Sequence, residues 1–192
     1  MNYMLAADEI YKLAKKAYYL PIYPDPRFPP SLYYRFFELL TEWWKPGMSV
    51  ELGLCGGGCS LHMVLGYPDG IVLGVDFTDD YPDNRKHLEA TCENFKFLHM
   101  DSITAAEEYQ VLYPDIYVDI LFIDTNHTYE HTMAEYNAWF PNLNGNAIVI
   151  LDDLHRLGMM KAWYEIPGHH ILLDELHVGD TPTDGGFGAI LI

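Results

Sequence analysis

The sequence has few cysteines, few cationic side chains and no long apolar run. Its 192 residues include three Cys, and 11 Lys and Arg stand against 28 Asp and Glu, which gives a net charge of −17. An odd number of cysteines without a C-x-x-C spacing argues against both a disulfide framework and a thiolate zinc site, so we expect free thiols. The shortage of cations excludes a general nucleic-acid binder, because such proteins neutralise phosphates with Lys and Arg.

No apolar run approaches the roughly 20 residues that a membrane helix needs. The N-terminal segment also lacks the compact apolar core of a signal peptide. We therefore expect a cytoplasmic protein without a membrane partner. The hydrophobic content of 49% predicts a packed core, and the length is sufficient to build it without disulfide bonds or a structural metal.

The N-terminal part predicts helices. Residues 4–19 place apolar side chains at helical spacing, with acids early and lysines late, and residues 31–44 predict a second helix capped by Ser31. Between them, residues 21–30 contain five prolines and predict irregular structure. We expect residues 1–47 to form an N-terminal helical extension, whose many aromatic side chains either pack on the core or line a pocket.

From residue 48 onward, short apolar runs alternate with helical segments. Most runs are continuously apolar, which is typical of strands buried on both faces of a mainly parallel sheet. The predicted fold class is α/β, with a Rossmann-like, seven-stranded, mainly parallel sheet and helices on both faces. The expected strands are 48–52, 70–76, 95–101, 118–124, 146–153, 169–174 and 187–192, and the expected helices are 59–66, 84–93, 102–111, 128–140 and 154–164.

Acidic residues fall at the ends of five of these strands. They are Glu51, Asp76, Asp101, Asp124 and the pair Asp152 and Asp153. The carboxyl ends of parallel strands share one edge of an open sheet, where ligands bind, so we expect the acids to converge on one site. Clustered carboxylates raise one another's pKa unless cations or hydrogen-bond donors compensate their negative charge. The pattern therefore predicts a ligand that carries positive charge or hydroxyl groups.

The loop after the first strand is rich in glycine and reads ELGLCGGGCS from Glu51 to Ser60. It fits neither the G-x-G-x-x-G pattern nor a P-loop, and the lack of a nearby Lys or Arg disfavours a phosphate. Asp76 follows Gly53 by 23 positions, a spacing typical of an acid that accepts ribose hydroxyls in nucleotide-binding α/β folds. A nucleoside with a cationic centre and no phosphates satisfies these constraints.

The ordered set of these motifs resembles the class I S-adenosylmethionine-dependent methyltransferases over residues 48–192. The motifs are Glu51-x-Gly53-x-x-x-Gly57, Asp76, Met100-Asp101-Ser102 and Asp124. The resemblance implies a methyltransferase domain over that range, with S-adenosylmethionine as cofactor. It places Gly53 and Gly57 against the methionine part, Asp76 on the ribose, Asp101 on the adenine amino group and Glu51 near the amino end. Cys55, Ser60, Ser102 and Asp124 complete the implied cofactor site.

The segment from Asp124 to Glu130, followed by Asp152 and Asp153, resembles a metal-dependent branch that includes the macrolide-sugar O-methyltransferases. This resemblance implies Mg²⁺ held by Asp124, Asp152 and Asp153, and His127 as the base for an acceptor hydroxyl. Asn126 departs from the commoner relatives, which often carry an acid there. In a purely structural interpretation, Asp153 caps a helix that begins near residue 154, and His127 is an ordinary residue in the first turn of a helix.

Two alternatives stay open beside the main hypothesis. His127-x-x-Glu130-His131 matches the H-x-x-E-H pattern of inverted zinc peptidases, and a domain of this fold could bind S-adenosylmethionine without turnover. Our hypothesis is an S-adenosylmethionine-dependent methyltransferase that acts on a hydroxyl of a small molecule, such as a sugar or polyhydroxylated natural product. It predicts no nucleic-acid partner and leaves a homo-oligomer open.

Overall fold

The computed structural model describes residues 3–19, 32–156, 158–176 and 185–192. These described residues form seven α-helices and a seven-stranded sheet. The helices are α1 (Tyr3–Tyr19), α2 (Leu32–Trp44), α3 (Gly58–Gly66), α4 (Pro82–Thr91), α5 (Ser102–Leu112), α6 (Tyr129–Trp139) and α7 (Met159–Glu165), with 3-10 turns η1 (Phe140–Asn142) and η2 (Asp174–Leu176). The strands are β1 (Met48–Leu52), β2 (Ile71–Asp76), β3 (Phe95–His99), β4 (Val118–Ile123), β5 (Leu143–Leu151), β6 (His169–Leu172) and β7 (Gly188–Leu191).

The sheet has the order β3-β2-β1-β4-β5-β7-β6. Strands β1 to β5 pair in parallel, whereas β7 pairs antiparallel with both β5 and β6. The chain builds outward from β1 to β3 and then returns to β4 on the other side of β1, which makes a topological switch point between β1 and β4. The predicted α/β class and mainly parallel sheet are confirmed.

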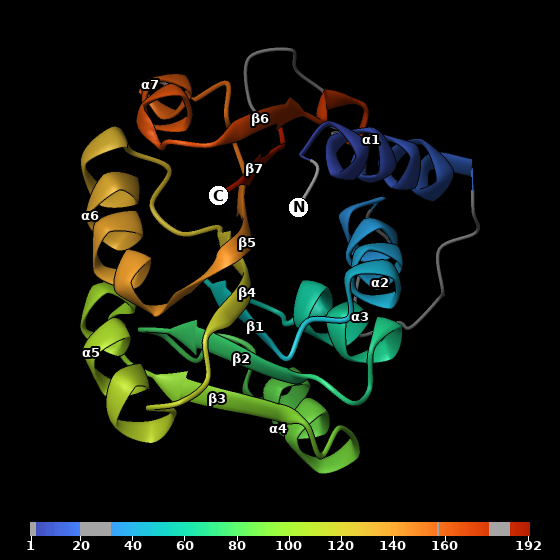
Figure 1. The fold of residues 1–192 in the computed structure, drawn as a ribbon. Helices are drawn as coiled ribbons and strands as arrows, with labels where there is room; N and C mark the ends of the chain where they lie inside the picture. The colour runs from blue at the N-terminus through green and yellow to red at the C-terminus, as the bar shows by residue number, and fades with distance from the viewer. Residues whose placement is uncertain (1–2, 20–31, 157, 177–184) are drawn as a thin grey trace.

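Helices cover both faces of the sheet, with α5 and α6 on one side and α2 and α3 on the other (Figure 1). Strand β4 shows why its sequence is continuously apolar. Ile120 and Phe122 pack into the core beneath α2, while Leu121 and Ile123 pack into the core beneath α5 and α6. Alternate side chains of a strand point to opposite faces, so both sets must be apolar when both faces are buried.

The two N-terminal helices belong to the same core as the sheet. Phe37 of α2 lies 4.7 Å, between ring centroids, from Phe122 of β4, and Phe36 lies 5.7 Å from Phe187 beside β7. Tyr3 at the start of α1 donates a hydrogen bond to the carbonyl of Ile192 at 3.3 Å, so the start of α1 lies beside the residues that follow β7 (Figure 1). Aromatic packing thus fastens α2 to the sheet.

The boundaries differ from the sequence-based prediction mainly after β5. The helix expected over 154–164 begins at Met159, because the backbone has positive φ at Asp153 (53°) and at Gly158 (91°). Leu154 and His155 lie in a turn that the Arg156 amide closes by donating to the Asp153 carbonyl at 3.0 Å. The interpretation of Asp153 as the cap of a helix starting near residue 154 is therefore wrong.

Three further expectations concern the segment before α2, the cysteines and membrane-spanning helices. Ser31 and the proline-rich segment 21–30 lie outside the described residues. The three cysteines, all within the described part, are free thiols as predicted. Among the described residues, no helix combines the length and the apolar character that crossing a membrane requires.

Candidate active site

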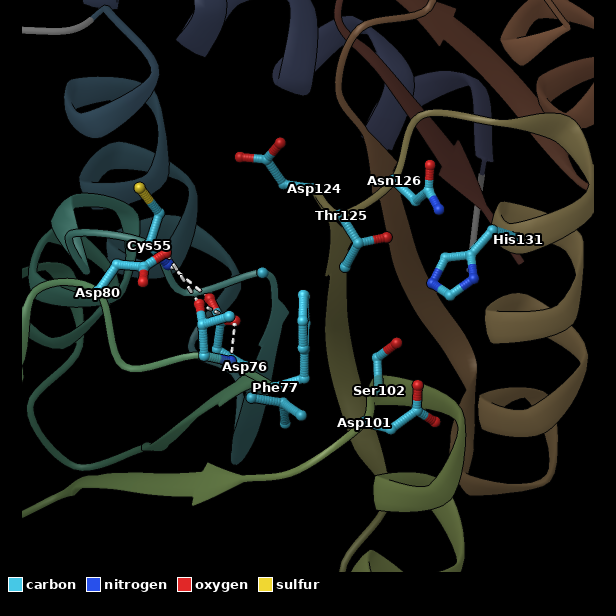
Figure 2. A pocket seen from close by; sticks show the side chains of 13 residues that line it. Cys55, Asp76, Phe77, Asp80, Asp101, Ser102, Asp124, Thr125, Asn126 and His131 are labelled. Carbon is cyan, nitrogen blue, oxygen red and sulfur yellow. Dashed lines mark hydrogen bonds between the residues drawn. The ribbon is translucent and has the colours of Figure 1, made fainter.

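A cleft of about 530 Å³ opens at the carboxyl ends of the central parallel strands, next to the switch point between β1 and β4. It brings together six of the predicted site residues, namely Gly53, Cys55, Asp76, Asp101, Ser102 and Asp124. Val75, Phe77, Thr78, Asp80, Thr125, Asn126 and His131 complete the lining. Cys55, Asp76, Phe77 and Asp80 lie on one side, and Asp101, Ser102, Thr125 and His131 lie on the other (Figure 2).

The glycine loop lies close to the end of β4 at Gly53 and close to α4 at Gly57, because neither residue carries a side chain. Gly53 has φ +88°, and a Cβ there would lie 2.0 Å from the Asp124 carbonyl oxygen. Gly57 has φ +75°, and its Cβ would lie 2.6 Å from a methyl carbon of Leu88. Glycine tolerates both the left-handed backbone and the close approach. The loop therefore leaves open space above the strand ends for a ligand.

Asp76, at the end of β2, is fixed by backbone amides in the wall of the cleft. Its Oδ2 accepts a hydrogen bond from the Cys55 amide at 3.0 Å, and its Oδ1 accepts from the Thr78 amide at 2.9 Å. These bonds hold the carboxylate in one orientation (Figure 2). It can accept further hydrogen bonds from ligand hydroxyls without reorganising, since a carboxylate has about four acceptor positions.

Asp101 both caps α5 and lines the cleft. Its Oδ1 accepts from the amides of Ile103 (3.1 Å) and Thr104 (3.0 Å), which satisfies donors at the start of the helix. The hydrogen bond from the Thr104 amide lowers the pKa of Asp101 below its ordinary value. The carboxylate is therefore ionised at neutral pH, and Oδ2 is the oxygen that can meet a ligand.

The predicted cofactor residues Glu51, Gly57 and Ser60 do not line this cleft, and neither do the predicted base and metal ligands His127, Asp152 and Asp153. The Glu51 carboxylate is buried and accepts a hydrogen bond from the Ser60 amide at 2.9 Å and another from the Ser60 hydroxyl. Burial raises the pKa of Glu51 to about 8. In this arrangement Glu51 joins β1 to the start of α3. Its contact with the amino end of a cofactor stays a prediction.

Carboxylates from the ends of β4 and β5 meet around His127. Its Nε2 lies 3.6 Å from Asp124 Oδ1 and 3.3 Å from Asp153 Oδ2. Burial raises the pKa of Asp124 well above its ordinary value, and the adjacent Asp152 carboxyl, hydrogen-bonded to it, raises that pKa further. Asp124 and Asp153 therefore both lie near His127, and the roles of these residues in metal binding and catalysis stay predictions.

The backbone at this cluster is in the left-handed region at two non-glycine residues. His127 has φ +48° and Asp153 has φ +53°. Such conformations cost free energy and gather at functional sites, where the surrounding structure enforces them. His127 Nδ1 is buried without a hydrogen-bond partner among the described residues. Burial lowers the pKa of His127, so the imidazole is neutral at neutral pH.

The carboxylates have the oxygen chemistry that Mg²⁺ prefers, but their present arrangement does not group them around one point. Arg156 Nε lies 2.7 Å from Asp153 Oδ2 and acts as the counter-cation there. Within residues 3–19, 32–156, 158–176 and 185–192, no three His, Cys, Asp or Glu side chains are placed to hold a metal ion. In this structure, therefore, the positive charge beside Asp153 comes from Arg156.

The H-x-x-E-H pattern does not form a zinc site in this fold. His127 precedes α6 and faces Asp124 and Asp153, whereas His131 lies within α6 and contacts Glu135 at 3.2 Å. The two histidines therefore do not share one helical face with a common ligand position. The zinc-peptidase alternative is wrong for this reason.

Sequence reasoning missed part of the cleft wall. Phe77, Thr78 and Thr125 directly follow β2 and β4, so their position after a strand end could have indicated them. His131 was considered only as a zinc ligand, and Glu135 was not considered. The i, i+4 spacing of His131 and Glu135 on α6 was the available signal.

Comparison with known protein families identifies the class. The family described as "Methyltransferase domain" matches residues 50–154, which is more than half of the chain. The chain belongs to this methyltransferase family, and the predicted resemblance is confirmed. A search of curated proteins finds no match.

Several solved structures share the fold. An O-methyltransferase from Bacillus cereus in complex with SAH has a TM-score of 0.67 at 15% identity, covering 97% of this chain and 90% of that chain. The O-methyltransferase TomG from Streptomyces achromogenes, involved in tomaymycin synthesis and solved with SAM, has a TM-score of 0.65 at 13% identity, covering 97% and 89%. CalS11, a TDP-rhamnose 3'-O-methyltransferase of calicheamicin biosynthesis, has a TM-score of 0.58 at 18% identity, covering 94% and 92%.

Proposed function

We propose that this protein transfers the methyl group of S-adenosylmethionine to a hydroxyl oxygen of a small molecule, such as a sugar or a polyhydroxylated natural product. The observation that carries the proposal is the acid-lined cleft at the switch point of the sheet. Membership of the methyltransferase family supports methyl transfer. The solved O-methyltransferases of similar fold, among them a sugar O-methyltransferase, support an oxygen acceptor.

The cleft suits the nucleoside part of S-adenosylmethionine. Asp76 presents a fixed carboxylate to the ribose hydroxyls, and Asp101 presents an ionised carboxylate to the adenine amino group. Gly53 has no side chain to obstruct the cleft, so the sulfonium end would extend toward Asp124. Carboxylates favour this positively charged group, and no phosphate has to be accommodated among them.

His127 would remove the proton of the acceptor hydroxyl. Its lowered pKa leaves a lone pair available at neutral pH, and Asp124 and Asp153 beside Nε2 would stabilise the imidazolium that forms. The hydroxyl oxygen forms a bond to the methyl carbon while the carbon–sulfur bond breaks. The electron pair stays on sulfur, and S-adenosylhomocysteine leaves. Holding the oxygen in line with the sulfonium supplies much of the acceleration.

We also propose that Mg²⁺ assists, with Asp124, Asp152 and Asp153 as its protein ligands. A bound divalent cation would orient the acceptor hydroxyl and lower its pKa. The surroundings of Asp124 support the proposal, because its pKa is raised first by burial and then by the neighbouring carboxylates of Asp152, Glu51 and Asp153, which a cation would offset. Arg156 now supplies the positive charge at Asp153, so we expect it to move away when the ion binds.

The first experiment separates binding from catalysis. Calorimetry is expected to detect binding of both S-adenosylmethionine and S-adenosylhomocysteine. A methyl-transfer assay over a panel of sugars and polyhydroxylated acceptors is expected to give methyl ethers. Binding without transfer to any acceptor would favour the alternative, a binding domain without turnover. If the protein bound neither S-adenosylmethionine nor S-adenosylhomocysteine, the proposed methyl transfer would be wrong.

The second experiment addresses the metal. Excess chelator is expected to abolish transfer, and added Mg²⁺ is expected to restore it. Arg156→Gln should tighten binding of Mn²⁺, measured by electron paramagnetic resonance without substrates, because it removes the cation that competes at Asp153. An unchanged rate in excess chelator would remove Asp152 and Asp153 from the mechanism and leave the methyl transfer itself in place.

A further inference from the structure

A buried carboxylate lies directly behind one wall of the cleft. Glu135 on α6 is fully buried, with 0% of its surface exposed. It does not line the cleft itself. Burying a carboxylate costs considerable free energy unless hydrogen-bond donors surround it. The stability of this arrangement therefore depends on the groups that contact Glu135.

Three donors surround Glu135, and all three line the cleft. The Ser102 hydroxyl donates to Oε1 at 2.5 Å, and the Thr125 hydroxyl lies 2.9 Å from both carboxylate oxygens. His131 Nε2 lies 3.2 Å from Oε1. These donors come from the start of α5, the loop after β4 and α6. One carboxylate thus joins three parts of the same wall, and Figure 2 shows Ser102, Thr125 and His131 on that side of the cleft.

Two other hydrogen bonds also connect α6 and η1 to α5. Trp139, one turn after Glu135, donates from Nε1 to the Ser102 carbonyl at 2.9 Å. Asn142 donates from Nδ2 to the Ala106 carbonyl at 3.1 Å. Helix α6 and the turn η1 that follows it are therefore fixed against α5 by buried hydrogen bonds independent of Glu135. The Glu135 carboxylate has the more local effect of orienting the Ser102 and Thr125 hydroxyls.

That orientation determines what the wall presents to a ligand. A hydroxyl has one donor hydrogen, and in Ser102 and Thr125 this hydrogen points to Glu135. A hydroxyl that donates its hydrogen to Glu135 can act toward a ligand in the cleft only as an acceptor. Asp101 adjoins them with an ionised carboxylate, which is also an acceptor. This wall therefore favours a ligand group that donates hydrogen bonds and disfavours a carbonyl.

We propose that Glu135 is a positioning residue for base specificity. By taking the hydrogens of Ser102 and Thr125, it makes the wall select a purine that carries an amino group at carbon 6 over one that carries a carbonyl there. The inference rests on the proposed function, since it assigns this wall to the base of the nucleoside. It concerns how this chain recognises the base and does not depend on the acceptor or on a metal.

The test compares two ligands that differ only at carbon 6 of the base. S-adenosylhomocysteine carries the amino group, and S-inosylhomocysteine carries a carbonyl. Calorimetry on the full chain is expected to show adenosyl binding at least about tenfold tighter, the effect of one hydrogen bond of roughly 1.4 kcal/mol. In Glu135→Gln the amide can donate to the hydroxyls, which then turn their hydrogens to the cleft, so the preference should fall about tenfold.

Glu130→Gln is the matched control, because Glu130 is exposed on the first turn of the same helix. It should leave both affinities unchanged. If Glu135→Gln does not fold, Thr125→Val removes one oriented hydroxyl with nearly the same shape and should also reduce the preference. A purely structural role would weaken both ligands equally.

The outcomes distinguish the inference from the function. An unchanged ratio of affinities in folded Glu135→Gln, or in Thr125→Val where that variant replaces it, would overturn the inference. Equal affinities for the two ligands in the unaltered protein would also overturn the inference and leave the proposed function standing. Failure of the unaltered protein to bind either ligand would overturn both.

Discussion

Asp76 is the residue on which ligand binding should depend most directly. Asp76→Asn keeps the shape of the side chain but replaces one acceptor oxygen by a donor. We expect S-adenosylhomocysteine binding to weaken by about 10- to 100-fold, since hydrogen bonds to a charged group contribute roughly 1.5–3 kcal/mol. Calorimetry measures this. Asp115→Asn, an exposed position before β4, is the control and should bind normally. Equal affinity in Asp76→Asn would remove Asp76 from the ribose site.

His127 should affect the rate and leave binding unchanged. His127→Ala removes the proposed base, which contributes roughly 10²- to 10⁴-fold to such reactions. We expect kcat to fall by about this factor while the affinity for S-adenosylhomocysteine stays the same. His169→Ala is the control, because His169 is exposed on the edge strand β6. Loss of binding in His127→Ala would contradict the division of roles between Asp76 and His127.

The pH dependence of kcat follows from the same histidine. Burial lowers the pKa of His127 below the ordinary value of about 6.5. The base works only in its neutral form, so kcat should be constant near neutral pH and decline only once the pH falls below 6.5. The decline should disappear in the residual activity of His127→Ala. A decline that begins well above neutral pH would point to another group.

Sequence patterns predicted elements better than they predicted boundaries or buried polar contacts. All seven apolar runs form strands, because a strand buried on both faces must be apolar throughout. The position of β7 between β5 and β6 could not be inferred, since antiparallel pairing across a long connection leaves no period in the sequence. The start of α7 was missed because positive φ at Asp153 depends on its surroundings.

In the candidate site, too, some residues could be predicted from the sequence and others could not. Acids at strand ends were predictable, because the geometry of a parallel sheet brings carboxyl ends to one edge. Glu135 was not predictable, because a glutamate on a helix ordinarily faces water. Only the packing of α6 against α5, through Trp139 and Ser102, buries its carboxylate. Arg156 as the partner of Asp153 likewise depends on a turn that no local pattern indicated.

At the level of elements, the contact between α2 and the glycine loop can be tested at Gly58, the first residue of α3. A Cβ on Gly58 would lie 2.1 Å from Cζ of Tyr34, and the tyrosine ring cannot move away without disturbing α2. Gly58→Ala should therefore lower the free energy of unfolding by about 1–3 kcal/mol. Urea unfolding measures this. The clash should be relieved in the double variant with Tyr34→Ala.

Gly145→Ala is the matched control for this prediction. Gly145 lies near the start of β5, and no atom lies within 4 Å of a Cβ built there. We expect its effect on the free energy of unfolding to stay within about 0.5 kcal/mol. If Gly58→Ala were equally mild, the helix and the loop would be less tightly packed than the structure indicates.

At the scale of the whole molecule, we expect the free energy of unfolding to depend on pH. The chain has a net charge of −17, and several carboxyl groups are buried with raised pKa values. Glu51 is the clearest case, because burial raises its pKa from 4.5 to about 8. The folded protein therefore retains a proton on Glu51 between these two pH values, whereas the unfolded chain has lost it.

The sign of the effect follows from proton linkage. The stabilising contribution of protonated Glu51 is complete below pH 4.5, and it is lost as the pH rises through about 8. We therefore expect Tm to be higher at pH 6 than at pH 8. Glu51→Gln has no carboxyl group to titrate between pH 6 and pH 8, so its Tm should depend less on pH. Glu107→Gln, exposed on α5, should keep the full dependence. A Tm that rises from pH 6 to pH 8 would mean that Glu51 is ionised in the folded protein, held by donors in addition to Ser60.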